Sequence, residues 1–321
     1  MKTQRWLLAA CCLAAAPVSA ADFPGKPLQI IVPFGAGGTP NLIARLVAEA
    51  SAQPLGQPVV VHNQPGASGV IAIQAALNAP ADGYTLLMLD NGQLAINPHL
   101  NRKLPYDPVK SFRPITQIVS QPFLVFARSD LQLDSLKDLG EVARKAGRPL
   151  NFASVGNGSP HHLCMSMVAD RAGVELTHVP YKSVSEIVQS IMAGDIDMVC
   201  TSSVGVRAAL EAGKAKPLAV ASGQRTAQFP DVPTIGEALN AQPVLVGATI
   251  GLVVRAETPD AEAKRLSDAM VEVIRSPALT QRLQELGMSV VADGPDAYAS
   301  VIRDELGRYG DMVSVAGVKL D

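Results

Sequence analysis

Residues 30–41 read IIVPFGAGGTPN, and residues 150–161 read LNFASVGNGSPH. Each stretch is an apolar, strand-like run that passes through a Gly-rich turn to a hydroxyl residue and a proline. Thr39 and Ser159 suit the N-cap of a helix, and the proline after each suits the first helical position, where the missing N–H is not needed. Each stretch therefore predicts a strand, a tight loop and a helix whose N-terminus faces the loop.

Both loops have the features of an anion-binding site. Glycines let backbone N–H groups approach a ligand, and a helix N-terminus carries about half a positive charge, which favours a carboxylate or a phosphate. One such loop alone is equally well explained as an ordinary turn from strand to helix. Because the pattern occurs twice, about 120 residues apart, we interpret it as two lobes that face one ligand.

Strand-like and helical patterns alternate along the rest of the chain, which predicts an α/β fold with mostly parallel sheets. The expected strands cover residues 28–32, 59–62, 85–89, 196–200 and 216–221, and the expected helices cover residues 136–146, 184–193, 261–275 and 296–309. Ligands of open α/β sheets bind beyond the carboxyl ends of strands. The polar strand ends at 90–93 and 201–203 are therefore further candidates for the site.

The length of 321 residues favours two domains, each large enough for its own core. A proline-rich stretch from Leu104 to Val125 predicts the first crossing between domains, and the prolines at 230, 233 and 243 precede the return. The expected domains are residues 21–122 together with 243–321, and residues 123–242. The two C-terminal helices are expected to return to the first lobe.

The first 20 residues have the pattern of a secretory signal peptide. A basic start is followed by an apolar run and by small residues up to Ala20, after which we expect cleavage and export to the periplasm. The alternative is a lipoprotein signal that ends at Cys11. The apolar stretch before it is only about five residues long, which is shorter than usual.

Composition excludes several classes of partner. The net charge is −2, and removal of Lys2 and Arg5 with the signal peptide leaves 25 basic against 29 acidic residues, a net charge of −4. Nothing here indicates a nucleic acid partner. Aromatic residues make up only 4%, which disfavours surfaces that stack bases or sugars.

Two cysteines, Cys164 and Cys200, remain after the signal peptide. An exported protein can form a disulfide, but both cysteines lie in apolar runs where buried free thiols are also common. Both possibilities stay open. The cysteine spacing indicates no metal site, and no cofactor is expected.

Enzymatic function is the main chemical alternative. A hydrolase would use Ser159 as nucleophile with His161 or His162 as base. The chain has no G-x-S-x-G elbow, and a helix cap explains Ser159 better. The two G-x-G pairs lack the third glycine of a dinucleotide fingerprint, so we expect no catalytic residue and no nucleotide. Lys182 follows an expected strand and is either a positive charge for the site or a surface lysine.

The ordered motifs of the chain resemble a known family, the Bug-type extracytoplasmic solute receptors of tripartite tricarboxylate transporters. The resemblance covers essentially the whole chain after residue 20. The motifs are IVPF at 31–34 with Gly37 and Gly38, VVV at 59–61 with Asn63, PGA at 65–67, DGYTLL at 82–87, LPYDP at 104–108, Gly158-Ser159 with His162-Leu163, HVPYK at 178–182 and PDVPT at 230–234.

The resemblance implies a two-lobed periplasmic-binding-protein type II fold, with each lobe a Rossmann-like sheet flanked by helices. It also implies that both Gly-rich loops hold a ligand carboxylate, partly through backbone N–H groups. The chain departs from the family's common pattern at Asn41, where the family has Asp, at Ser183, where it has Gly, and at Glu186, where it has Pro. An amide at position 41 can donate as well as accept, which changes what the site recognises. Asp90 and Glu186 are candidate acceptors for an ammonium or hydroxyl group.

We therefore expect a monomeric periplasmic receptor that binds a small carboxylate, such as a di- or tricarboxylate, an amino acid or an aromatic acid, and delivers it to membrane transporter subunits. The alternatives are a ligand-presenting partner of a sensor kinase and a secreted hydrolase. The expected ligand-binding residues are Phe34, Gly35, Ala36, Gly37, Gly38, Thr39, Asn41, Asp90, Asn91, Ser154, Gly156, Asn157, Gly158, Ser159, His162, Lys182 and Ser202.

Overall fold

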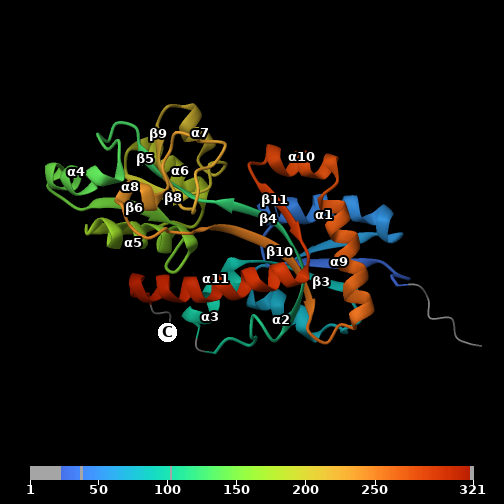
Figure 1. Ribbon diagram of the computed structural model, residues 1–321. Coiled ribbons are helices and arrows are strands. Elements are labelled where there is room, and N and C mark those ends of the chain that lie inside the picture. Colours follow the sequence, from blue (N-terminus) through green and yellow to red (C-terminus); the bar gives the residue numbers. More distant parts are fainter. Residues whose placement is uncertain (1–22, 37–38, 102, 319–321) are drawn as a thin grey trace, which may run out of the picture.

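The computed structural model describes residues 23–36, 39–101 and 103–318. The proposed signal peptide and its cysteines lie outside these residues. The described chain forms two lobes, each built on one β-sheet with helices on both faces (Figure 1). Within the described residues, no helix combines the length and the apolar character needed to cross a membrane.

The first lobe contains a six-stranded sheet in the order β11-β4-β10-β3-β1-β2. Its strands are β1 (Leu28–Val32), β2 (Val59–Asn63), β3 (Thr85–Asp90), β4 (Phe112–Pro122), β10 (Gly247–Arg255) and β11 (Ser289–Asp293). Its helical segments are α1 (Thr39–Leu55), η1 (Ala67–Gly69), α2 (Val70–Asn78), η2 (Gly92–Ile96), α3 (Asn97–Leu100), α9 (Asp260–Ile274) and α10 (Pro277–Glu285).

The second lobe contains a five-stranded sheet in the order β7-β6-β8-β5-β9. Its strands are β5 (Leu124–Arg128), β6 (Leu150–Ser154), β7 (Leu176–Pro180), β8 (Met198–Thr201) and β9 (Ala215–Val220). Its helical segments are η3 (Leu136–Asp138), α4 (Leu139–Ala146), α5 (Pro160–Ala172), α6 (Val184–Ala193), α7 (Arg207–Glu211) and α8 (Ile235–Leu239).

Both sheets are mixed, so the prediction of mostly parallel sheets is wrong. Strand β1 pairs in parallel with β2 and β3, and β6 pairs in parallel with β7 and β8. In contrast, β10 is antiparallel to β3 and β4, and β5 is antiparallel to β8 and β9. The crossing between lobes explains the antiparallel pairs. Strands β5 and β10 each arrive from the other lobe, start at the edge where the parallel strands end, and therefore run in the opposite direction to them.

Two crossing segments and one long helix join the lobes. Strand β4 continues through Phe123 directly into β5, and the chain returns through residues 243–246 into β10. The long helix α11 (Pro295–Ala316) runs beneath both lobes (Figure 1). Its Tyr298 and Ile302 pack in a core of the first lobe, whereas Met312 and Val313 pack in a core of the second.

The expected domain boundaries remain a prediction, although every strand of each sheet lies on the expected side of them. The second half of α11 packs against the second lobe and not only the first, in contrast to the expected return of both C-terminal helices. Helix α10 and the edge strand β11 were not predicted. The other expected elements occur near their predicted bounds, except that α11 continues to Ala316, past its predicted end at residue 309.

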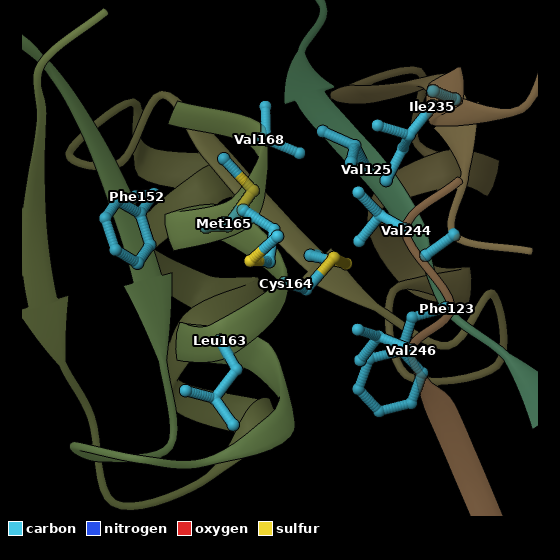
Figure 2. Close-up of a cluster of buried hydrophobic side chains, with 14 of the residues drawn as sticks. Phe123, Val125, Phe152, Leu163, Cys164, Met165, Val168, Ile235, Val244 and Val246 are labelled. Carbon is cyan, nitrogen blue, oxygen red and sulfur yellow. A yellow bond between two sulfur atoms is a disulfide. The ribbon is translucent and has the colours of Figure 1, made fainter. Parts of the chain in front are cut away.

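The two cysteines form a disulfide that joins α5 to β8. Their Cα atoms are 6.1 Å apart, and both side chains are fully buried. Figure 2 shows Cys164 near the middle of the apolar cluster that includes Val125, Phe152 and Val246. The bond fixes the helix that carries the second Gly-rich loop to the centre of its sheet.

We expect the double substitution of Cys164 and Cys200 by alanine to lower the free energy of unfolding by about 4 kcal/mol, because the bond closes a 36-residue separation and thereby restricts the unfolded chain. Urea unfolding of both proteins, with and without a reductant, measures the loss. Reduction should destabilise only the wild-type protein. Equal stability of the oxidised wild type and the variant would contradict the assignment.

Candidate ligand-binding site

The second Gly-rich loop joins β6 to α5 as predicted. The Ser159 hydroxyl accepts a hydrogen bond from the N–H of His162 at 3.3 Å and donates to the carbonyl of Gly156 at 2.7 Å. Pro160 is the first residue of the helix. Gly156 and Gly158 have φ angles of 118° and 73°, which a side chain would disfavour. Ser159 is thus confirmed as the N-cap of α5.

The first Gly-rich loop leads from β1 to α1 as predicted. Helix α1 is described from Thr39, and Gly37 and Gly38 before it lie outside the described residues, so the cap at Thr39 stays a prediction. Asn63, at the end of β2, donates to the carbonyl of Phe34 at 2.9 Å and accepts from the buried amide of Asn41 at 2.8 Å. Arg45 donates to the Asn41 oxygen at 3.3 Å. The Asn41 amide therefore helps to hold the loop against β2.

A cavity of about 450 Å³ lies where the two lobes meet. It is bounded by the carboxyl ends of β1, β3 and β6, which is the edge where ligands of open α/β sheets bind. The residues that line it are Pro33, Phe34, Gly66, Ser68, Gly69, Asp90, Asn91, Gly92, Gln93, Ile96, Asn97, Leu100, Phe123, Val155, Asn157, Gly158, Ser159, Pro160, His161, Gly247 and Ala248. Its size is typical of sites for small molecules.

The other hollows do not lie at the carboxyl ends of β1, β3 and β6. One of about 600 Å³ lies on the first lobe beside α9, with Arg113, Asp260 and Lys264 on its wall. Another of about 530 Å³ involves both lobes but is lined by β11, the end of α10 and residues 226–228. Neither is lined by a predicted ligand-binding residue. A third hollow of about 690 Å³ is lined by His162 and His178 of the second lobe but by no strand end of the first lobe. We therefore take the cavity at the strand ends as the candidate site.

Six of the predicted ligand-binding residues line this cavity: Phe34, Asp90, Asn91, Asn157, Gly158 and Ser159. They come from both lobes, as the two-loop hypothesis expects. Asn91 also has an internal role, because its amide donates to the carbonyl of Gly247 and to the hydroxyl of Tyr309, both at 2.7 Å.

Two other predicted residues, Ser154 and His162, support the second loop without lining the cavity. The Ser154 hydroxyl accepts from the N–H of Gly156 at 3.0 Å and lies 2.6 Å from Nε2 of His178. His162 accepts the N–H of Gly158 on Nδ1 at 3.1 Å, and its ring stacks on that of His178 with centroids 4.0 Å apart. Burial, with a smaller contribution from the neighbouring His178, lowers the pKa of His162 to about 4. At pH 7 the imidazole is therefore neutral, which lets Nδ1 act as an acceptor.

The remaining predicted residues are not among the described residues that line the cavity. The backbone N–H of Lys182 donates to the Glu186 carboxylate at 3.1 Å, and Ser183 caps α6. Ser202 accepts the N–H of Gly205 in a local turn. The structure does not bring Lys182, Glu186 or Ser202 to this cavity, and the same holds for Gly35, Ala36, Thr39, Asn41 and Gly156.

One wall of the cavity, the turn at Gly66–Gly69, was not predicted from the sequence. Ala67 and Ser68 both have positive φ angles, 45° and 53°, which is uncommon for residues other than glycine. Asn97 holds this turn by donating to the carbonyl of Ser68 at 2.9 Å. The PGASG run at 65–69 was a usable signal, because glycines flank the turn immediately before an apolar helix. The π-helical segment η2, which supplies Gly92, Gln93 and Ile96, had no comparable signal.

The charge of the cavity is unusual for a site expected to hold an anion. Its described lining contains no lysine or arginine, and its ionisable groups are Asp90 and His161. Burial raises the pKa of Asp90 to about 6, against the opposing effect of hydrogen bonds from Gly92 and Gln93. Burial also lowers the pKa of His161 to about 4, so that imidazole is neutral at pH 7.

The geometry does not support Ser159 as a nucleophile. Its hydroxyl donates to Gly156, and the Nδ1 atom of His162 is occupied by the N–H of Gly158. His161 packs on Phe123 with ring centroids 4.9 Å apart. Among the described residues no hydrogen bond joins the Ser159 hydroxyl to either imidazole, so the base that a serine hydrolase needs is not in place.

We expect stability to fall as the pH drops from about 6.5 to 4 through the protonation of His162. Its pKa is depressed in the folded state, so the unfolded chain binds the proton first and gains stability from it. The His162→Gln variant should lose at least about 1 kcal/mol less than the wild type across this range, because partial access of solvent to the ring reduces the effect of the pKa shift. Urea unfolding at a series of pH values measures the difference. The His62→Gln variant is the matched control, because it removes an exposed histidine. Parallel pH profiles for wild type and His162→Gln would contradict this role.

Known proteins resemble this chain over nearly its whole length. The family model described as the tripartite tricarboxylate transporter family receptor matches residues 43–318. Protein BugT of Bordetella pertussis is 32% identical over 310 residues, which cover 95% of this chain and 94% of BugT.

Two solved structures have the same fold and similar sequences. The structure of R. palustris Rpa4515 with adipate has a TM-score of 0.81 and 29% identity, and covers 94% of this chain and 100% of that one. The structure of MatC from Rhodopseudomonas palustris with bound malate has a TM-score of 0.76 and 30% identity, and covers 91% and 100%. The chain belongs to the tripartite tricarboxylate transporter receptor family, the TctC or Bug-type periplasmic solute-binding proteins.

Proposed function

We propose that this protein binds a small carboxylate in the cavity between its lobes and delivers it to the membrane subunits of a tripartite tricarboxylate-type transporter. The observation that carries the proposal is the cavity itself, where the capped N-terminus of α5 meets the ends of β1 and β3 from the other lobe. The proposed site of action is the periplasm, after cleavage of the signal peptide following Ala20.

Neutral donors would hold the carboxylate. The N-terminus of the 13-residue helix α5 presents the positive end of its dipole and the N–H of His161, which finds no hydrogen-bond partner among the described residues. Backbone groups around Gly158 and the amide of Asn157 line the same space, whereas the Asn91 amide donates within the protein. The adipate and malate in the two related structures are carboxylates, which supports this ligand class.

Closure of the lobes would depend on how closely Gly158 approaches Leu100. Gly158 belongs to the second lobe and Leu100 to α3 of the first, and a Cβ on Gly158 would overlap the Leu100 side chain. Because Leu100 is itself buried, it has little room to move away. Hinge closure around a ligand is the common motion of this class of receptor, and a side chain at position 158 would oppose it.

We expect carboxylates to raise the stability of the ligand-free protein by about 2.7 kcal/mol at a hundredfold excess over the dissociation constant. A thermal-shift screen of mono-, di- and tricarboxylates, amino acids and aromatic acids measures this, and calorimetry then gives the affinity. No stabilisation by any acid, with protein refolded to remove carried-over ligand, would refute the proposal.

The Gly158→Ala variant should bind the best acid of that screen at least about tenfold more weakly, because its methyl group keeps the lobes apart. Gly173→Ala is a matched control, since Gly173 has a similar φ of 64° at the other end of α5 but open space around it. Both variants should lose about 1 kcal/mol of stability from backbone strain. Equal affinity of the two variants would show that the contact at Leu100 does not govern binding.

A further inference from the structure

One acidic side chain stands out in the cavity. Asp90 is the last residue of β3, and its Oδ1 accepts the N–H of Gly92 at 2.8 Å. A Cβ on Gly92 would lie only 2.8 Å from that same oxygen. The glycine therefore allows the carboxylate to turn back over the start of η2 while it lines the cavity.

The surroundings keep this carboxylate without a cationic partner. The described lining residues include no lysine or arginine, and His161 is neutral at pH 7. The nearby groups whose charges interact with Asp90 are Tyr106, Tyr298 and Glu305, and none of them is a cation. With its pKa near 6, Asp90 is about nine-tenths ionised at pH 7.

The two walls of the cavity are therefore opposite in polarity. The second lobe offers the positive end of α5, capped by Ser159, and the first lobe offers the carboxylate of Asp90. A plain dicarboxylate would bring a second anion to the acidic wall. A molecule with an anionic end and a cationic end would match both walls.

We propose that Asp90 accepts the ammonium group of a small amino acid whose carboxylate lies against the N-terminus of α5. This inference rests on the proposed function and narrows its ligand class. Asp90 is the specificity-determining residue in it. It selects against acids that lack the amine, because those leave the Asp90 carboxylate without a cationic partner, and a dicarboxylate also brings a like charge toward it.

Calorimetry at pH 7.5 with matched acid pairs tests the assignment. The pairs are succinate and aspartate, glutarate and glutamate, and butyrate and 4-aminobutyrate, which differ only in the amine. We expect the wild-type protein to bind the preferred amine at least tenfold more tightly than its plain partner. If the wild-type protein binds the plain acids as tightly as their amine-bearing partners, or more tightly, the assignment is overturned. This outcome can be read from the wild-type protein alone.

The Asp90→Asn variant should lose the preference for the amine by at least tenfold, because the amide removes the charge but keeps the size. Asp304→Asn makes the same charge change on the exposed face of α11 and should leave the preference unchanged. An unchanged preference in Asp90→Asn would also overturn the assignment. Binding of plain acids without an amine preference would leave the carboxylate receptor standing, whereas no binding by any acid would overturn both.

Discussion

The hydrogen bonds at the point where the chain crosses between lobes hold the two halves of the site in register. The N–H of Phe123 donates to the carbonyl of Val246, and the N–H of Ala221 donates to the carbonyl of Phe123, at 2.9 and 2.8 Å. These bonds align the outgoing and returning segments where each enters its new sheet. The cavity depends on this alignment, because its walls are loops at the strand ends on either side of the crossing.

The same crossing is tied to the cavity and to α11 by one buried amide. Asn91 lines the cavity and donates both to Gly247, the first residue of β10, and to Tyr309 on α11. A ligand that contacted Asn91 would therefore act on a returning strand and on the helix that spans both lobes. This is the physical route by which occupancy of the cavity can reach the hinge.

The sequence predicted the strands and the second loop well because local chemistry determines both. Ser159 and Pro160 are a cap and a first helical residue in any context, and a central strand such as β3 has a continuous apolar run. Contacts between segments far apart in the chain were not predictable in this way. Asn41 reads as a residue facing a ligand, yet the structure pairs it with Asn63 of β2. Ala67 and Ser68 take left-handed conformations that their side chains do not favour, and only the assembled wall of the cavity requires them.

The absence of lysine and arginine from the described lining of the cavity suits a receptor that must also release its ligand. A strong cation on one lobe would hold an anion in the open form as firmly as in the closed form. A ligand can shift an equilibrium only by its difference in affinity between the two states. Dipolar groups near Ser159 on one lobe and a fixed group such as Asp90 on the other act together only when the lobes are closed. Under the proposed function, binding energy divided in this way would drive closure, and opening of the lobes would remove both contacts at once.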